Sequence, residues 1–187
     1  MLGTFRLSLA ALPVAMLVTA TGSGARAQSF DDYPEARIET YLVTGATPAE
    51  IFSSITTNAR DALPNGGQAH AYAQSQFNWT TRSNGNRCEV DLTIELLVVF
   101  PQHVDPQGLT GDAWTWWDAY IKTLEIHEAG HLRIASETYP VLLDALQSGS
   151  CSGANERGMA ILDDLAARQT RYDAITNHGA TQERASN

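Results

Sequence analysis

The sequence predicts one α+β domain in which a small, mainly antiparallel sheet packs against helices. Alternating apolar and polar residues, typical of strands, dominate between Arg37 and Phe100. From Asp112 onward the apolar residues recur at helical spacing instead. No internal repeat and no linker divides the chain, so we expect residues 28–187 to form a single domain.

The first 27 residues are predicted to be a secretory signal peptide. Met1–Arg6 carries one positive charge, Leu7–Ala20 is largely apolar, and Ala25-Arg26-Ala27 has the form of a cleavage site. Cleavage after Ala27 would leave a secreted or periplasmic protein. No later segment is apolar enough to span a membrane.

Composition excludes several classes of function. The 187 residues include 12 basic and 21 acidic side chains, for a formal net charge of -9. A nucleic-acid partner is not expected, because binding a phosphate backbone requires a basic face. With only two cysteines, one intramolecular disulfide is possible, between Cys88 and Cys151, and export makes it plausible.

The first elements are a strand and a capped helix. Arg37–Thr44 is rich in β-forming residues and ends at Gly45. Thr47 and Glu50 form a capping box, which predicts a helix that runs to about Ala62.

A hairpin is expected next. His70–Arg82 alternates as a half-exposed strand does, and Ser83-Asn84-Gly85-Asn86 is a turn signal. Arg87–Phe100 is the strongest strand, since it alternates first and then becomes continuously apolar. We expect it to form a sheet edge close to the functional site, a placement that rests on analogy and not on the sequence.

Two helices complete the predicted domain. The first extends from Asp112 to about Gln147, and Pro140 should kink or interrupt it. After a turn at residues 149–153, Ala154 to about Thr176 forms a second helix, which should pack antiparallel to the first.

The chemistry is concentrated in His127-Glu128-Ala129-Gly130-His131, an H-E-x-x-H pattern inside the first of these helices. Two histidines four residues apart lie about 40° apart around a helix, so both can bind one zinc ion. Glu128 cannot readily join them as a ligand, but it can take a proton from water and pass it to a leaving amine. This combination predicts a zinc peptidase acting on peptides or proteins.

Two residues remain as candidates for the third zinc ligand, since Glu156 of the following helix would lie about 21 Å of helix from His131 and is too distant. Glu137 occupies the place of a third ligand in one metalloprotease pattern, but Ile134 stands where that pattern needs glycine. His178 follows the second helix, and an antiparallel helix pair would bring it close to the level of His127. The residues alone leave both candidates open.

Several further features occur in one order along the chain. They are Tyr41-x-Val43-x-Gly45, Phe77-x-Trp79, Cys88, Trp117, the H-E-x-G-H pattern, and Tyr172-Asp173-x-x-Thr176-x-His178-Gly179. In these features the chain resembles a bacterial family of predicted secreted zinc-dependent proteases, catalogued mainly as a domain of unknown function. The resemblance implies a zincin-like peptidase and favours His178 as the third ligand.

Other residues have competing interpretations. Tyr172 could stabilise the transition state or simply pack between helices, and Asp173 or Glu125 could orient a metal-bound histidine. Trp114, Trp116 and Trp117 could form a carbohydrate platform, although helical spacing favours a core position for at least part of the cluster. His70 and His103 are interpreted as structural.

Two alternatives to the peptidase stay open. One is a non-catalytic envelope binding or assembly protein whose zinc, if it binds any, is structural. The other is a cell-wall amidase that uses the same zinc chemistry. Oligomeric state and substrate specificity do not follow from the sequence.

Overall fold

The structure is a computed structural model that describes residues 28–64, 66, 69–85 and 87–181. The predicted signal peptide, residues 1–27, lies outside the described residues. The main elements, in chain order, are β1 (Arg37–Val43), α1 (Pro48–Ala62), β2 (Tyr72–Asn84), β3 (Arg87–His103), α2 (Gly111–Gln147) and α3 (Ala154–Thr176). Short 3₁₀ turns lie at Phe30–Asp32, Pro106–Gly108 and Cys151–Gly153.

The three strands form one mixed sheet in the order β1-β3-β2. The long hairpin β2–β3 is antiparallel, whereas β1 runs parallel to β3. The α+β class is therefore confirmed. The expectation that Arg87–Phe100 forms a sheet edge is wrong, because β3 pairs with a neighbour on both sides and the free edges belong to β1 and β2.

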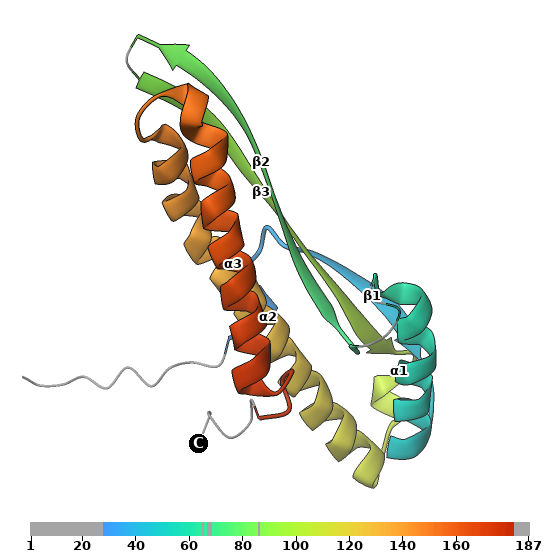
Figure 1. The fold of residues 1–187 in the computed structure, drawn as a ribbon. Helices are drawn as coiled ribbons and strands as arrows, with labels where there is room; N and C mark the ends of the chain where they lie inside the picture. Colours follow the sequence, from blue (N-terminus) through green and yellow to red (C-terminus); the bar gives the residue numbers. More distant parts are fainter. Residues whose placement is uncertain (1–27, 65, 67–68, 86, 182–187) are drawn as a thin grey trace, which may run out of the picture.

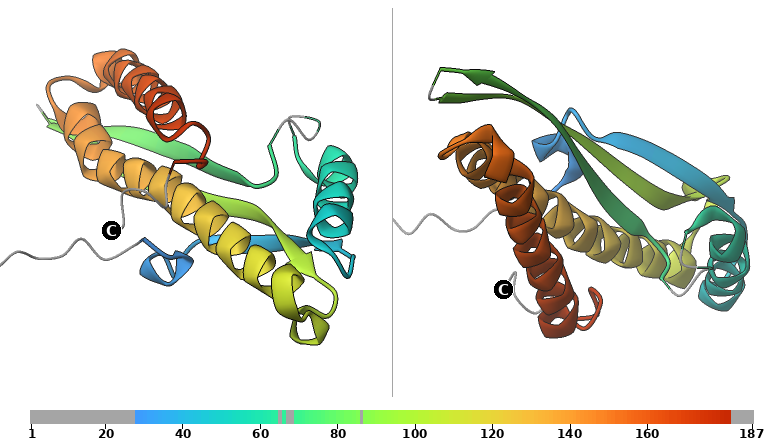
Figure 2. Two further views of the ribbon diagram at one scale, coloured as in Figure 1. Left: turned by 90° about the horizontal axis from the view of Figure 1, so that it is seen from below. Right: turned by 45° about the horizontal axis from the view of Figure 1, so that its top comes forward.

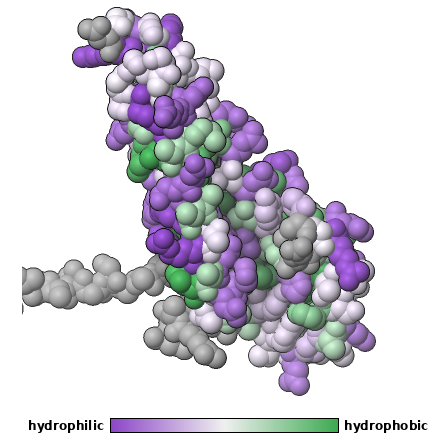
Figure 3. All heavy atoms as spheres, viewed as in Figure 1, coloured by the Kyte–Doolittle hydropathy of each residue, from purple (hydrophilic) through white to green (hydrophobic). Residues whose placement is uncertain are grey.

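The helices lie on one side of this sheet. Figure 1 and the two further views in Figure 2 show α2 and α3 side by side along the β2–β3 hairpin, with α1 at the far end of the sheet. The space-filling view in Figure 3 shows the surface hollowed between the α2–α3 pair and the α1 end of the molecule.

Helix α1 begins as predicted. The Thr47 hydroxyl accepts a hydrogen bond from the Glu50 backbone N–H, and the Glu50 carboxylate accepts one from the Thr47 N–H. Its apolar stripe, Ile51, Ile55 and Ala59, is fully buried against the sheet end. This packing holds α1 over the edge of the cavity described below.

Helix α2 continues through Pro140 instead of being interrupted there. Proline removes one backbone N–H from the helical ladder. Buried apolar side chains beyond it compensate, because Leu142 and Leu146 pack with Leu92 of β3 in one cluster. The long helix thus presents one continuous face to the sheet.

The predicted disulfide is present. Cys88 at the start of β3 is bonded to Cys151 in the turn between α2 and α3. It therefore ties the hairpin of strands to the hairpin of helices at one end of the molecule. Within the described residues, no helix is both long and apolar enough to cross a membrane.

Candidate metal centre

His127 and His131 lie one turn apart on α2 and face the same space. Their imidazole rings are 4.7 Å apart between centroids and almost perpendicular, and their Nε2 atoms are 3.3 Å apart. Both side chains are largely withdrawn from solvent, at 6% and 13% exposure. The helical spacing of the motif therefore produces the expected pair of convergent ring nitrogens.

Asp173 of α3 completes a group of three. Its Oδ1 atom lies 2.9 Å from His131 Nε2 and 3.2 Å from His127 Nε2. Among the described residues, these three side chains are the cluster able to hold a metal ion. Sequence reasoning considered Asp173 only as an orienting residue, whereas the structure places it directly against both ring nitrogens.

Neighbouring polar groups fix the proton positions on the histidines. Gln169 donates from Nε2 to the His131 carbonyl at 3.1 Å, so its Oε1 faces His131 Nδ1 at 2.5 Å. Since an amide oxygen only accepts, His131 Nδ1 must carry the hydrogen. The Thr176 hydroxyl donates to the Tyr172 carbonyl at 2.7 Å and can accept from His127 Nδ1 at 3.4 Å.

With Nδ1 of each ring partnered in this way, its Nε2 atom can offer a lone pair to a metal ion. The two Nε2 atoms and one carboxylate oxygen lie within 3.3 Å of one another. The spacing is close to the edge of about 3.3 Å of a tetrahedron with zinc–nitrogen bonds of about 2.0–2.1 Å. The donor set therefore fits zinc.

Glu128 occupies the other side of this group and is only 4% exposed. The backbone N–H of Ala73, on the free edge of β2, donates a hydrogen bond to its carboxylate. The pKa of Glu128 is raised to about 8, mainly by burial and next by the negative charge of Asp173. A cation bound beside the two carboxylates would oppose this shift.

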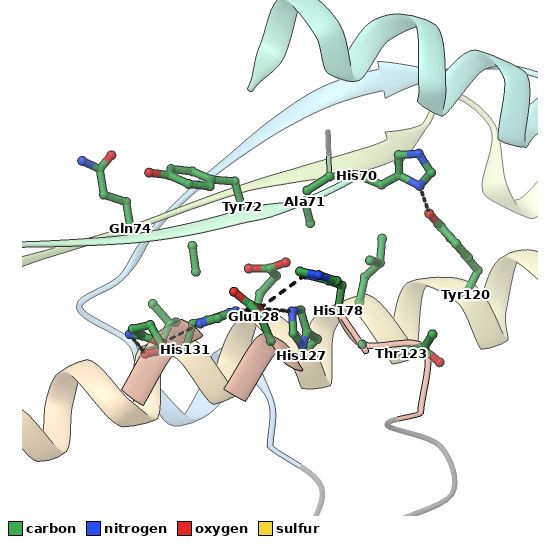
Figure 4. A pocket seen from close by; sticks show the side chains of 18 of the residues that line it. His70, Ala71, Tyr72, Gln74, Tyr120, Thr123, His127, Glu128, His131 and His178 are labelled. Carbon is green, nitrogen blue, oxygen red and sulfur yellow. Dashed lines mark hydrogen bonds and ion pairs between the residues drawn. The ribbon is translucent and has the colours of Figure 1, made fainter. Parts of the chain in front are cut away.

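The two predicted third ligands lie in different places. His178 is highly exposed, lines the same cavity, and has its Nδ1 atom 3.9 Å from Asp173 Oδ1 (Figure 4). Glu137 instead forms ion pairs with Arg133 at 2.8 Å and Arg168 at 2.9 Å. It takes no part in the group formed by the histidines and Asp173.

A left-handed turn returns the chain to the site after α3. Asn177, His178 and Gly179 all have positive φ angles, of 49°, 51° and 87°. Two consecutive non-glycine residues in this region are uncommon and are often found at functional sites. A Cβ atom on Gly179 would lie 3.2 Å from that of His127, so the turn passes tightly against this histidine.

The Tyr172 ring packs against the rings of both histidines. It stacks on His127 with centroids 5.2 Å apart, and it meets His131 edge-on at 5.0 Å. Gly130 makes this possible, because a Cβ atom there would lie 2.0 Å from the Tyr172 hydroxyl. Tyr172 does not contribute to the lining of the cavity, so its position favours the packing role over the predicted transition-state role.

One cavity of about 1160 Å³ contains the whole group. Its walls come from the start of β2, the first two-thirds of α2 and the end of α3. Figure 4 shows Glu128, His127, His131 and His178 directed toward a shared space beneath β2. The candidate metal centre is therefore open to solvent and large enough for a ligand of several residues.

The chain belongs to the family described as "Bacterial protein of unknown function (DUF922)", whose model matches residues 38–179. The match includes the H-E-x-x-H pattern, Asp173 and His178. No curated protein and no solved structure matches the chain.

Three residues whose contacts with the histidines were not predicted from the sequence share one face of α3. Gln169, Asp173 and Thr176 are spaced by four and three residues, which places them on one stripe of a helix. A polar stripe at the level of the two histidines was the available signal. Each residue was uninformative alone, because single polar side chains on helices are usually solvated.

Proposed function

We propose that this protein is an exported zinc-dependent peptidase in which His127, His131 and Asp173 hold the metal. In this proposal Asp173 takes the position that the sequence favoured for His178, because its oxygen is the one that meets both Nε2 atoms. The disulfide fits export, since such bonds persist in oxidising compartments.

The main support for the proposal is that two histidine nitrogens and one carboxylate oxygen lie close together beside a buried glutamate. A carboxylate oxygen of Asp173 faces both Nε2 atoms, and Gln169 and Thr176 contact the Nδ1 atoms on the other side of the rings. Such hydrogen-bond partners are typical of metal-binding histidines, whose orientation they fix.

Zinc, when bound, supplies a Lewis acid that polarises a carbonyl and makes water nucleophilic at neutral pH. Glu128 supplies the proton transfers. Its carboxylate accepts a proton from the attacking water and then delivers that proton to the leaving nitrogen. The Ala73 N–H holds this carboxylate against the free edge of β2, which limits its motion between the two steps.

The open cavity favours catalysis over a structural role for the metal. Structural zinc sites surround the ion with four protein ligands, whereas catalytic sites use three and leave one position free. Here three side chains converge, and all three line the open cavity. His178 lines the same cavity, where it can approach a bound substrate.

The test is hydrolysis by the zinc-loaded protein, produced with its own leader and purified from the periplasm. Quenched-fluorescent peptides and cell-wall muropeptides are assayed in parallel. We expect peptide cleavage, and we expect Glu128→Gln to lower the rate by about 10²-fold or more while zinc content is unchanged. Glu137→Gln, the same substitution nearby on α2, is the matched control and should retain full activity.

Other outcomes would overturn the proposal. Cleavage of muropeptide amides without cleavage of peptides would establish the amidase alternative. A protein that binds zinc and hydrolyses neither class would be the envelope binding protein with a structural metal.

A further inference from the structure

The cavity continues beyond the metal centre toward α1, and its far end is built from four rings. They are Phe52 of α1, His70 just before β2, and Trp116 and Tyr120 of α2. Figure 4 shows His70 and Tyr120 beneath α1, at the opposite side of the cavity from His127 and His131. The proposed chemistry uses none of the four.

The rings contact one another as a continuous wall. Trp116 stacks on Tyr120 with centroids 4.8 Å apart and planes 13° apart. Phe52 meets His70 edge-on at 5.2 Å and Trp116 edge-on at 6.4 Å. Because all four line the cavity, the wall can receive an apolar group against ring faces and edges.

Hydrogen bonds hold this wall in place. The Tyr120 hydroxyl lies 2.5 Å from His70 Nδ1, and the Tyr41 hydroxyl donates to the His70 carbonyl at 2.7 Å. A wall that is ordered before binding loses little conformational freedom when a ligand arrives. Phe52 nevertheless remains 47% exposed, although it is a large apolar side chain.

The charges in the cavity define the chemistry of the occupant. Among the described lining residues there is no lysine or arginine, and the only carboxylates are Glu128 and Asp173 at the metal centre. The aromatic end therefore offers no charged partner. It suits an uncharged, bulky apolar group rather than an ionised one.

Spacing along α2 relates the aromatic end to the metal centre. Tyr120 and Trp116 precede His127 by seven and eleven residues, or about 10 and 16 Å of helix at 1.5 Å per residue. An extended peptide covers about 3.3 Å per residue, so this distance corresponds to about three to five residues.

We propose that the aromatic end, defined by Phe52, His70, Trp116 and Tyr120, is a specificity subsite for a bulky apolar side chain of an extended peptide substrate. That side chain lies about three to five residues from the bond that is cleaved. The peptide nature of the ligand rests on the proposed function. The subsite makes the protein selective for longer peptides.

Binding and cleavage are measured separately. The probes are octapeptides of alanine and serine in which one phenylalanine is moved through every position. Calorimetry with zinc-loaded Glu128→Gln gives affinity without turnover, and the wild-type protein gives kcat/KM. We expect phenylalanine at one favoured position to raise both by about tenfold or more over alanine.

Three variants locate the effect. Phe52→Ala and Trp116→Ala should reduce the phenylalanine preference to about threefold or less. Trp114→Ala is the matched control, because Trp114 lies on the same helix and is 45% exposed but does not line the cavity. Phe52 is half exposed, so its variant should fold even if Trp116→Ala does not.

The outcomes separate the subsite from the peptidase. Peptide cleavage without any phenylalanine preference, or with a preference that survives in Phe52→Ala and Trp116→Ala, would overturn the subsite and leave the peptidase standing. A position-dependent preference in binding, lost in these variants, would support the subsite even if no peptide were cleaved, and the peptidase proposal alone would then fail.

Discussion

Glu128 is a carboxyl group withdrawn from water and held by the sheet edge. Its raised pKa, about 8, arises mainly from burial and next from the charge of Asp173. An ordinary glutamate in the unfolded chain titrates near pH 4.3. In the metal-free protein the folded state therefore keeps a proton that the unfolded state releases over the range between these values.

A pH dependence of stability follows for the metal-free protein. Because the folded state binds more protons than the unfolded state, the free energy of unfolding contributed by Glu128 is largest near pH 4 and is lost as the pH rises toward 8. The slope is at most about 1.4 kcal/mol per pH unit. Urea unfolding after chelation, at pH 5, 6, 7 and 8, measures it.

Glu128→Gln provides the comparison, since the amide has no proton to lose. The difference in unfolding free energy between the variant and the wild-type protein should change steadily across this range. If the unfolding free energies of the two proteins change in parallel with pH, the raised pKa of Glu128 in the metal-free folded protein would be contradicted.

Gly130 is the residue whose identity the zinc pattern alone does not explain. H-E-x-x-H leaves this position free, yet any side chain here would collide with the Tyr172 ring. Glycine lets the ring lie between the two helices and stack on His127. The spacing between α2 and α3, and with it the distance from Asp173 to the histidines, depends on this contact.

At the scale of elements, the strand and helix bounds followed closely from the sequence because capping, alternation and turn signals agreed. The predicted helix Ala154–Thr176 coincides with α3, and the Thr47–Glu50 capping box begins α1. The strand order could not be read in this way. Apolar alternation shows that β3 is well buried, but it does not show that β1 pairs with it in parallel.

The course of α2 shows a similar limit. Pro140 predicts a kink or an interruption from local chemistry alone, whereas the helix continues past it and tertiary packing of Leu142 and Leu146 holds the segment beyond. The position of Asp173 against both histidines was not predicted for a related reason. Its role depends on the alignment of two helices, and that alignment follows from the Gly130–Tyr172 contact.

The disulfide links two elements at the end of the molecule away from the metal centre. It closes a loop across 63 residues, for which chain entropy gives a stabilisation of about 4 kcal/mol. We expect the double variant Cys88→Ala/Cys151→Ala to unfold at lower urea concentration, with a loss of about 2–4 kcal/mol. Equilibrium urea denaturation of the oxidised wild-type protein and the variant measures this loss.

The same variant should keep its zinc under native conditions, because α3 still packs along α2 through Leu165, Tyr172 and Ile134. Unchanged urea stability would contradict the structural role assigned to the bond. Loss of zinc without loss of fold would contradict the expectation that zinc binding does not depend on the disulfide at the other end of the molecule.

At the scale of the whole molecule, the sheet, the long helix and the C-terminal helix enclose one cavity with two chemically different ends. The candidate metal centre lies at one end, and the four rings of the proposed aromatic subsite lie at the other. The sequence identified His127, Glu128 and His131 because their spacing is a local helical property. The cavity combines residues from α1, β2, α2 and α3, so its shape emerges only when these elements are packed together.

The most direct test of this account is metal content. Elemental mass spectrometry of the purified protein is compared with Asp173→Ala, His178→Ala and Glu137→Ala. We expect about one zinc per chain, lost in Asp173→Ala and retained in the other two variants. A wild-type protein that holds no zinc and takes up none when it is supplied would contradict the metal centre. Loss with His178→Ala but not with Asp173→Ala would contradict the assignment of the third ligand.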